Sequence, residues 1–427
     1  MFGPGDSSVV VECSANGTCA LIHAIFTSGL LFFTLLTAFA YTTLLERRFL
    51  ASIQSRIGPN RAGPKGFFQP VADGIKLIFK EDITPIAADK VVFYLAPVIR
   101  VVPALLVVAV IPLGPKVAIP WFDGKWYRVT QGLVDVNVGV LWILSITSLG
   151  IYGIVLAGWS SNNKYAMLGG LRSSAQMISY ELSMGLAVVV PILLAGSMSL
   201  GDIMDAQNDP PIIGWYIFQN PLAAAILFVA LLAEVNRAPF DLPEAEQELT
   251  AGYHTEYSGM KFALFFMAEY ISMVAVSMIG SALYLGGYHF LGVERFPLLG
   301  PLVYTVKVIL LLIGMIWVRG TLPRIRYDRL MMFGWKIMLP LALVAVAWTS
   351  VAVVIEEELG RGVYAVLSAV AFVLTLVGAA WWLSRAGRKT DVRERQPIEV
   401  VSLSGGPGVG AAALHAADRV IGAPVAL

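Results

Sequence analysis

Long apolar runs alternate along this chain with short segments that collect most of its charged residues. Nine runs are apolar enough to be interpreted as spanning helices, at residues 21–45, 91–111, 133–159, 174–195, 221–235, 262–285, 302–318, 338–355 and 363–383. A helix that crosses the hydrocarbon core of a bilayer needs roughly 20 such residues. The pattern therefore predicts an all-α, polytopic integral membrane protein with about nine transmembrane helices.

One segment between the first two runs has a different pattern. Its apolar residues recur at helical spacing, at Phe68, Val71, Ile75, Ile78 and Phe79, while Asp73, Lys76 and Lys80 fall on the other side. Such a helix is too polar to span and is suited to lying in the membrane interface. It is either a simple surface anchor or the roof of a cavity that admits an amphiphilic molecule.

Composition and charge support a membrane protein and give it an orientation. Hydrophobic residues make up 57% of the chain and charged residues 14%, which excludes an ordinary soluble domain. Lys and Arg concentrate in the segments at 46–90, 160–173, 236–261 and 319–337 and after residue 384. Because basic loops stay cytoplasmic, we expect an external N-terminus and a cytoplasmic tail in a bacterial cytoplasmic membrane.

Four regions follow from this pattern. We expect an external segment at 1–20, an eight-helix membrane domain at 21–355, an additional helix at 356–384 and a cytoplasmic tail at 385–427. The start of the chain lacks a basic region before its first apolar run, so the first helix is expected to be retained rather than cleaved.

The cysteines and histidines are few and scattered. Cys13 and Cys19 lie on the predicted outer side, where an oxidising compartment permits a disulfide. The sequence leaves a disulfide and two free thiols equally open. With two Cys and four His, it contains no iron–sulfur, haem or zinc spacing. We therefore expect no metal site, and any redox centre is expected in another chain.

Ionisable residues inside the apolar runs are the strongest candidates for function. Glu181 and Glu269 each lie about eight residues from the inner end of a run, which is roughly 12 Å at ~1.5 Å per residue. Glu234 lies nearer the cytoplasmic mouth, at the start of the acidic segment AEVNRAPFDLPEAEQELTAGYHTEY. A charge in hydrocarbon costs ~2.5 kcal/mol or more, so such groups face a protein interior or a water path. One buried Glu can be purely structural, whereas three of them beside an acidic loop favour a proton or ion path.

Two basic residues within the apolar runs can be explained without a role in a proton path. Arg100 lies deep in its run and is expected to be the partner of a carboxylate. Lys307 lies near the outer end of its run and is expected to snorkel toward the membrane surface.

Four segments together resemble one known family. They are AEVNRAPFDLPEAEQELTAGYHTEYSGMKFALFFMAEY, ERRFLASIQSRIGPNRAGPKGFFQPVADGIKLIFKED, LRSSAQMISYELSMG and RGTLPRIRYDRLMMFGWKIMLPLAL. They are similar in order and spacing to the H subunits of bacterial type I NADH-quinone oxidoreductase, or respiratory complex I, the counterparts of mitochondrial NADH dehydrogenase subunit 1. The resemblance covers roughly residues 20–355.

The resemblance implies a function and a set of site residues. Members of that family form the membrane side of the quinone chamber and carry glutamates that couple quinone reduction to proton translocation. Carried over, the match makes Glu181, Glu234 and Glu269 the proton relay, and residues 67–79 the helix beside the quinone entrance. The chamber and junction would include Arg47, Arg56, Arg61, Arg237, Asp241, Glu244, Glu246, Glu248, Glu256, Arg324 and Arg326.

The resemblance also implies cofactors and partners. Quinone would be the substrate, while FMN and iron–sulfur clusters would belong to partner subunits. The expected partners are the quinone-site and iron–sulfur subunits of the hydrophilic arm, the antiporter-like and small subunits of the membrane arm, and lipid, with no nucleic acid.

The sequence departs from the family after the eighth run. The ninth run and the Gly/Ala-rich tail are additions, and the GGPGVG of the tail lacks the strand and Lys of a phosphate loop. This composition is typical of a high-GC bacterium, in which menaquinone would be the substrate. Two alternatives stay open: the homologous membrane subunit of an energy-converting hydrogenase-type complex, and a secondary transporter, which predicts inverted repeats that the chain does not display.

Overall fold

A computed structural model describes residues 10–13, 16–120, 126–208, 210, 212–241, 251–290, 293, 296–359, 369–371, 373–375 and 377–378. The chain divides into two compact units, Met1–Thr375 and Leu376–Leu427. Every element discussed below belongs to the first unit. The predicted tail at 385–427 and most of the ninth predicted helix lie outside the described residues.

Seven helical stretches are long and apolar enough to cross a membrane. They are α1 (Gly17–Ile53), α3 (Lys90–Ala109), α4 (Gly139–Ser160), α5 (Lys164–Ala195), α10 (Gly259–Tyr284), Pro297–Thr321 with α11 (Gly300–Thr321), and Tyr327–Glu356. The last combines α12 (Tyr327–Phe333), the π-helical turn η5 (Gly334–Met338) and most of α13 (Leu339–Leu359). A shorter apolar helix, α8 (Pro221–Glu234), corresponds to the fifth predicted run. The all-α, polytopic class is thus confirmed, whereas the count of nine is not.

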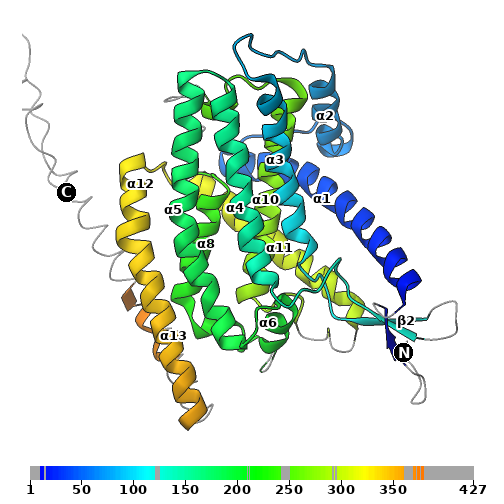
Figure 1. Cartoon of the computed structure of the whole chain (residues 1–427), viewed down its shortest axis with the longest axis vertical. Helices are drawn as coiled ribbons and strands as arrows, with labels where there is room; N and C mark the ends of the chain where they lie inside the picture. The colour runs from blue at the N-terminus through cyan, green and yellow to red at the C-terminus, as the bar shows by residue number, and fades with distance from the viewer. Residues whose placement is uncertain are drawn as a thin grey trace, which may run out of the picture. The chain divides into compact units, whose positions relative to one another are not determined.

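The helices pack around a centre formed by α3, α4, α5, α8 and α10 (Figure 1). Helix α3 packs on α4 and α10, while α5 packs on α4, α8 and α13. Helix α1 contacts α10 and α11 and runs diagonally to the bundle. Many of its outer-half side chains are exposed, including Phe26 and Phe33 at 68% and 69%.

Small residues bring α3 and α4 together. A Cβ atom on Gly153 would lie 2.9 Å from the main-chain nitrogen of Arg100, and one on Gly150 would lie 2.9 Å from Arg100 Nη1. In membranes, helix association depends on such close packing because lipid tails are as apolar as the helix surface. The two glycines therefore make room for Arg100 and its helix.

We expect Gly153→Ala to destabilise the fold. The new methyl group would press on main-chain atoms of α3, which cannot rotate away, and overpacking typically costs about 1–3 kcal/mol. The thermal unfolding midpoint of the full chain in detergent should therefore fall. Gly29→Ala on α1 is the matched control, because nothing lies within 4 Å of its added Cβ. Equal midpoints for the two variants would contradict this explanation.

A small sheet closes the end of the molecule at which α1 begins. It contains β1 (Val10–Glu12), β2 (Val117–Pro120) and β3 (Trp126–Val129) in the order β1-β3-β2. Strand β1 pairs with β3 in parallel, and β2 pairs with β3 antiparallel. The sheet thus joins the N-terminal segment to the connection between α3 and α4.

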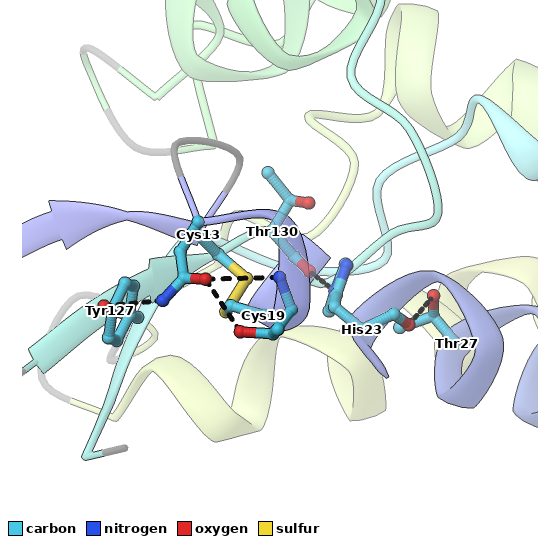
Figure 2. Close-up of a disulfide and its surroundings, with 8 residues drawn as sticks. Cys13, Cys19, His23, Thr27, Tyr127 and Thr130 are labelled. Carbon is cyan, nitrogen blue, oxygen red and sulfur yellow. Dashed lines mark hydrogen bonds between the residues drawn. A yellow bond between two sulfur atoms is a disulfide. The ribbon is translucent and has the colours of Figure 1, made fainter. Parts of the chain in front are cut away.

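The two cysteines form a disulfide beside this sheet, which settles the alternative that the sequence left open. Figure 2 shows Cys13 bonded to Cys19 at the start of α1. Asn16 accepts a hydrogen bond from Thr18 N as the helix cap, and its Nδ2 donates to the Tyr127 hydroxyl at 3.0 Å. His23 Nε2 lies 3.1 Å from Thr130 O. These contacts fasten the first turns of α1 to β3 and the residues after it.

Lys307 does not snorkel, so that expectation is wrong. Its residue is 8% exposed, and its ammonium donates to the carbonyl oxygens of Leu285, Gly287 and His289 at 2.6, 2.8 and 2.8 Å. The indole ring of Trp215 lies 4.3 Å from the same ammonium. The last carbonyls of a helix have no partner within it and attract a cation. Leu285 is the C-cap of α10, and Gly287 and His289 follow it, so Lys307 binds the turn after this helix instead of reaching for the surface.

The predicted amphipathic helix forms as α2 (Gln69–Phe79). None of its residues is buried, and Val71, Ile75 and Phe79 are more than half exposed. Its acidic residue Asp73 lies 2.6 Å from Arg47 Nη1, near the C-terminal end of α1. Polar contacts rather than burial therefore hold this helix against the protein.

Candidate functional site

A buried group of charges joins four segments of the chain. We call it the Arg237 cluster, and its members are Glu46 on α1, Arg237 after α8, Glu269 and Tyr270 on α10, and Arg319 on α11. Arg237 Nε lies 2.9 Å from Glu269 Oε1, and Arg237 Nη1 lies 3.6 Å from Glu46 Oε1. Arg319 pairs with the same oxygen of Glu46. Glu46, Arg237 and Glu269 are 4%, 7% and 5% exposed.

The cluster is balanced in charge, and Glu46 accepts hydrogen bonds from both Tyr270 and Arg319. Two carboxylates face two guanidinium groups, the Tyr270 hydroxyl donates to Glu46 Oε2 at 2.7 Å, and the Arg237 guanidinium lies 4.3 Å from the centre of the Tyr270 ring. Taking ions out of water is costly unless each has a close partner. Removing Arg237 would therefore leave Glu269 buried without its close cation.

The turn that follows α8 places Arg237 in the cluster. Helix α8 ends at Glu234, and Asn236 adopts a left-handed backbone conformation with φ 53°. Gln176 on α5 directs its Nε2 at Ala233 O, Asn236 Oδ1 and Phe240 O, at 3.1, 3.1 and 3.0 Å. The fully buried amide of Gln176 thus fastens the turn to α5 and fixes the direction of Arg237.

A second group surrounds Glu234, the last residue of α8, which interacts electrostatically with Arg100 and Glu181. We call it the Glu234 cluster, and it contains Arg100 on α3, Ser148 on α4, Glu181 on α5 and Glu234 on α8. Arg100 and Glu234, at 7% and 6% exposure, line the same cavity of about 20 Å³. The Ser148 hydroxyl donates to Glu181 Oε1. Arg100 and Glu234 therefore line one cavity, whereas no ion pair joins them among the described residues, so the expected partnership stays a prediction.

Glu234 borders a second cavity of similar size. This cavity, also about 20 Å³, is lined by Glu234, Thr147 and apolar side chains of α4, α5 and α10. A cavity of roughly 10–15 Å³, counted as the space open to the centre of a water-sized sphere, holds one water molecule. Among the described residues, Glu234 Oε2 has no hydrogen-bond partner. Both cavities next to this carboxylate thus have room for a water molecule.

The structure arranges the three predicted relay glutamates differently from the sequence pattern. Equal depth suggests that Glu181 and Glu269 act together, but Glu181 bonds to Ser148 while Glu269 pairs with Arg237. Glu234 and Arg237 lie three positions apart on one turn. This turn, rather than a shared depth, links the two clusters.

Most predicted junction residues lie outside the clusters and form separate contacts. Arg47 pairs with Asp73, Arg324 Nη2 lies 3.5 Å from Asp241, and Arg326 pairs with its neighbour Asp328. Glu256 accepts a hydrogen bond from Asn163 Nδ2 at 2.6 Å. Arg56 donates to Gln54, and Arg61 is exposed. Glu244, Glu246 and Glu248 lie outside the described residues.

Three members of the Arg237 cluster, Glu46, Tyr270 and Arg319, are absent from the predicted site. Glu46 is part of an ERR sequence, which is typical of the polar end of a transmembrane helix. Arg319 follows an apolar run, where a basic residue ordinarily marks the cytoplasmic end. The one feature that could have singled out Glu46 is that it lies inside the long helix α1 and not in the loop after it. Periodicity along one helix cannot show which neighbouring helix it faces.

Apolar helices that enclose paired charges define a polytopic membrane protein built to keep ionisable groups away from both lipid and bulk water. Comparisons with known proteins identify the family. A model of the family described as NADH dehydrogenase matches residues 26–350. The chain belongs to this family of enzymes, as the four resembling segments predicted.

Several curated relatives are similar over most of the chain. The first of two H subunits of NADH-quinone oxidoreductase from Geobacter sulfurreducens is 49% identical over 331 residues, which cover 76% of this chain and 93% of the relative. The second H subunit of the enzyme from Syntrophobacter fumaroxidans is 48% identical, with 78% and 97% covered. The H subunit from Deinococcus radiodurans is 49% identical, with 76% and 81% covered.

Proposed function

We propose that the chain is the H subunit of a proton-pumping NADH-quinone oxidoreductase in a bacterial inner membrane. The names of its relatives support this subunit and its quinone substrate. In this proposal residues 21–355 form the domain that carries the site, the helix at 356–384 and the tail at 385–427 are additions, and menaquinone is the quinone that the composition favours.

The chain forms part of the quinone chamber and couples quinone reduction to proton movement. The observation that carries this proposal is the turn at residues 234–237, which joins a carboxylate at two water-sized cavities to an arginine shared by two carboxylates. Quinone reduction to quinol takes up two electrons and two protons. The change in charge at the chamber would act on these buried groups, which interact strongly where the effective dielectric is low.

The Arg237 cluster is suited to pass such a change on. Arg237 has two carboxylate partners at different distances, Glu269 at 2.9 Å and Glu46 at 3.6 Å. Protonation of Glu269 would weaken its pair and shift Arg237 toward Glu46. The neighbouring Glu234 would then change its proton affinity, so that the clusters titrate as a coupled system. Glu181, hydrogen-bonded to Ser148, would be the next carboxylate in the relay.

The other residues at the basic end of the helices would form the junction with the hydrophilic arm. Arg47, Arg324 and Asp241 lie at this end and would contact the quinone-site and iron–sulfur subunits. Antiporter-like and small membrane-arm subunits and lipid would cover the helices. The chain's only two cysteines bond to each other, so it has no thiolate for an iron–sulfur cluster. In this proposal the iron–sulfur clusters and FMN belong to partner subunits.

The disulfide supports the proposed orientation. Disulfides persist in oxidising compartments, and Cys13–Cys19 lies at the opposite end of α1 from Arg47. An external N-terminus and a cytoplasmic tail satisfy both this observation and the distribution of basic residues.

Purification of the tagged chain from gently solubilised membranes tests the proposal. We expect flavin-containing and iron–sulfur subunits to accompany it, and the preparation to reduce quinone with NADH. Copurification with hydrogenase-type subunits would support the alternative complex. Purification of the chain alone, with substrate uptake after reconstitution, would support a transporter.

A further inference from the structure

A second buried lysine has a set of contacts that the proposed relay does not use. Lys261, in the first turn of α10, is 5% exposed, and its ammonium lies 2.9 Å from Asp82 Oδ1. It donates to Thr84 Oγ1 at 2.8 Å and to Ile83 O at 3.3 Å. All three partners belong to the loop at residues 80–89, which connects α2 to α3.

Aromatic rings enclose the remaining side of the ammonium. The ring centres of Phe93 and Tyr94, both on α3, lie 4.9 and 4.6 Å from Lys261 Nζ. A cation over an aromatic face is attracted to the ring, and more strongly when it is desolvated. Lys261 thus binds the loop after α2 and the start of α3 at the same time.

Neighbours of Lys261 strengthen the same connection. Ser258 Oγ accepts a hydrogen bond from Ile83 N at 2.9 Å. Gly259 adopts a φ of 56°, and a Cβ there would lie 3.4 Å from Lys80 O. The main chain of α10 therefore begins in direct contact with the end of α2. Because no residue of α2 is buried, these contacts and the Arg47–Asp73 pair are what fix its position.

The segment before Lys261 also packs against the start of α3. Tyr257 stacks on Phe93 with ring centres 4.1 Å apart, and its hydroxyl donates to Phe93 O at 3.3 Å. Residues 251–257 follow the acidic loop directly. The start of α10 thus contacts residues 80–84, which follow α2, and is joined directly to residues 251–257.

We propose that Lys261 is a positioning residue that fixes helix α2 relative to the start of α10 and to residues 251–257. The inference rests on the proposed function, in which α2 borders the quinone entrance and the acidic loop borders the chamber. Lys261 does not touch the substrate or the relay. It sets the geometry of the entrance by holding the 80–84 loop against α10.

A spin label on α2 tests the positioning role directly. The native cysteines bond to each other, so Gly74→Cys introduces the only free thiol of the full chain, at a site with open space around the added Cβ. In nanodiscs, we expect Lys261→Met to increase the mobility of a nitroxide at position 74, because α2 would then move more freely relative to α10. Lys261→Arg should restore the native mobility of the label, and Lys336→Met, at an exposed lysine, should leave the spectrum unchanged.

Asp82→Asn provides a second variant should Lys261→Met fail to fold, because it removes the ion pair from the loop side. An unchanged label spectrum in the folded variant would overturn the positioning role. This readout needs no quinone turnover, so it stands or fails independently of the proposed function.

Kinetics of the assembled complex separate positioning from a general loss of structure. With Lys261→Met, we expect the KM for a long-chain quinone to rise several-fold while kcat stays the same, since a displaced entrance affects access rather than chemistry. Lys261→Arg should restore the normal KM. A fall in kcat at constant KM would contradict the inference.

Discussion

Replacing Arg237 with methionine is expected to prevent stable folding of the chain. The substitution would leave Glu269 buried without its closest cation and would remove one of the two arginines beside Glu46. Breaking a buried ion pair by removing one partner typically costs about 3–5 kcal/mol. That is a large fraction of the total stability of an ordinary domain, so we expect little chain in the membrane and a lower unfolding midpoint.

Two further variants identify the cause of this loss. Arg237→Lys keeps the charge but not the planar guanidinium that reaches both carboxylates, so partial stability is expected. Arg329→Met removes an exposed arginine and should not change the midpoint. If Arg237→Met folded as stably as Arg329→Met, the Arg237 cluster would not be a structural centre of the fold.

Replacing Glu234 with glutamine is expected to stop coupled proton translocation while the complex still assembles. Glutamine matches glutamate in size and can hydrogen-bond, but it does not titrate. Loss of a proton-transferring group typically costs 10²–10⁴-fold in rate, so we expect acidification of inverted vesicles to fall by about ten-fold or more. Quinone reduction should slow in parallel if the two processes are obligatorily coupled.

An exposed glutamate provides the matched control for this variant. Glu358→Gln changes a side chain near the far end of α13, and the complex that carries it should pump at the normal rate. Normal acidification and NADH oxidation by an assembled Glu234→Gln complex would remove Glu234 from the relay.

The helices could be predicted because each spans an apolar run of nearly the required length. The interfacial helix α2 followed from its spacing, and Glu234 and Glu269 stood out because ionisable residues in apolar runs are costly. These are local properties, so one sequence was sufficient to find them. The family resemblance then supplied the expected roles.

The pairing of charges could not be predicted because it depends on which helices are neighbours. Glu46 and Arg319 are separated by 273 positions, and both read as ordinary loop charges until α1 and α11 are placed together. Lys307 lies near a helix end in the sequence, yet its ammonium binds the carbonyls of the turn that follows α10. Equal depth in two helices likewise did not show that Glu181 and Glu269 belong to different clusters.

Glu234 is central to the proposed coupling, because it is the carboxylate that we expect to change protonation when quinone is reduced. Infrared difference spectroscopy of the assembled complex, oxidised against reduced, reports the carboxyl C=O stretch of buried glutamates directly. We predict a difference band in the native complex that Glu234→Gln abolishes and Glu358→Gln preserves. Identical carboxyl bands in the native and Glu234→Gln complexes would contradict this role of Glu234.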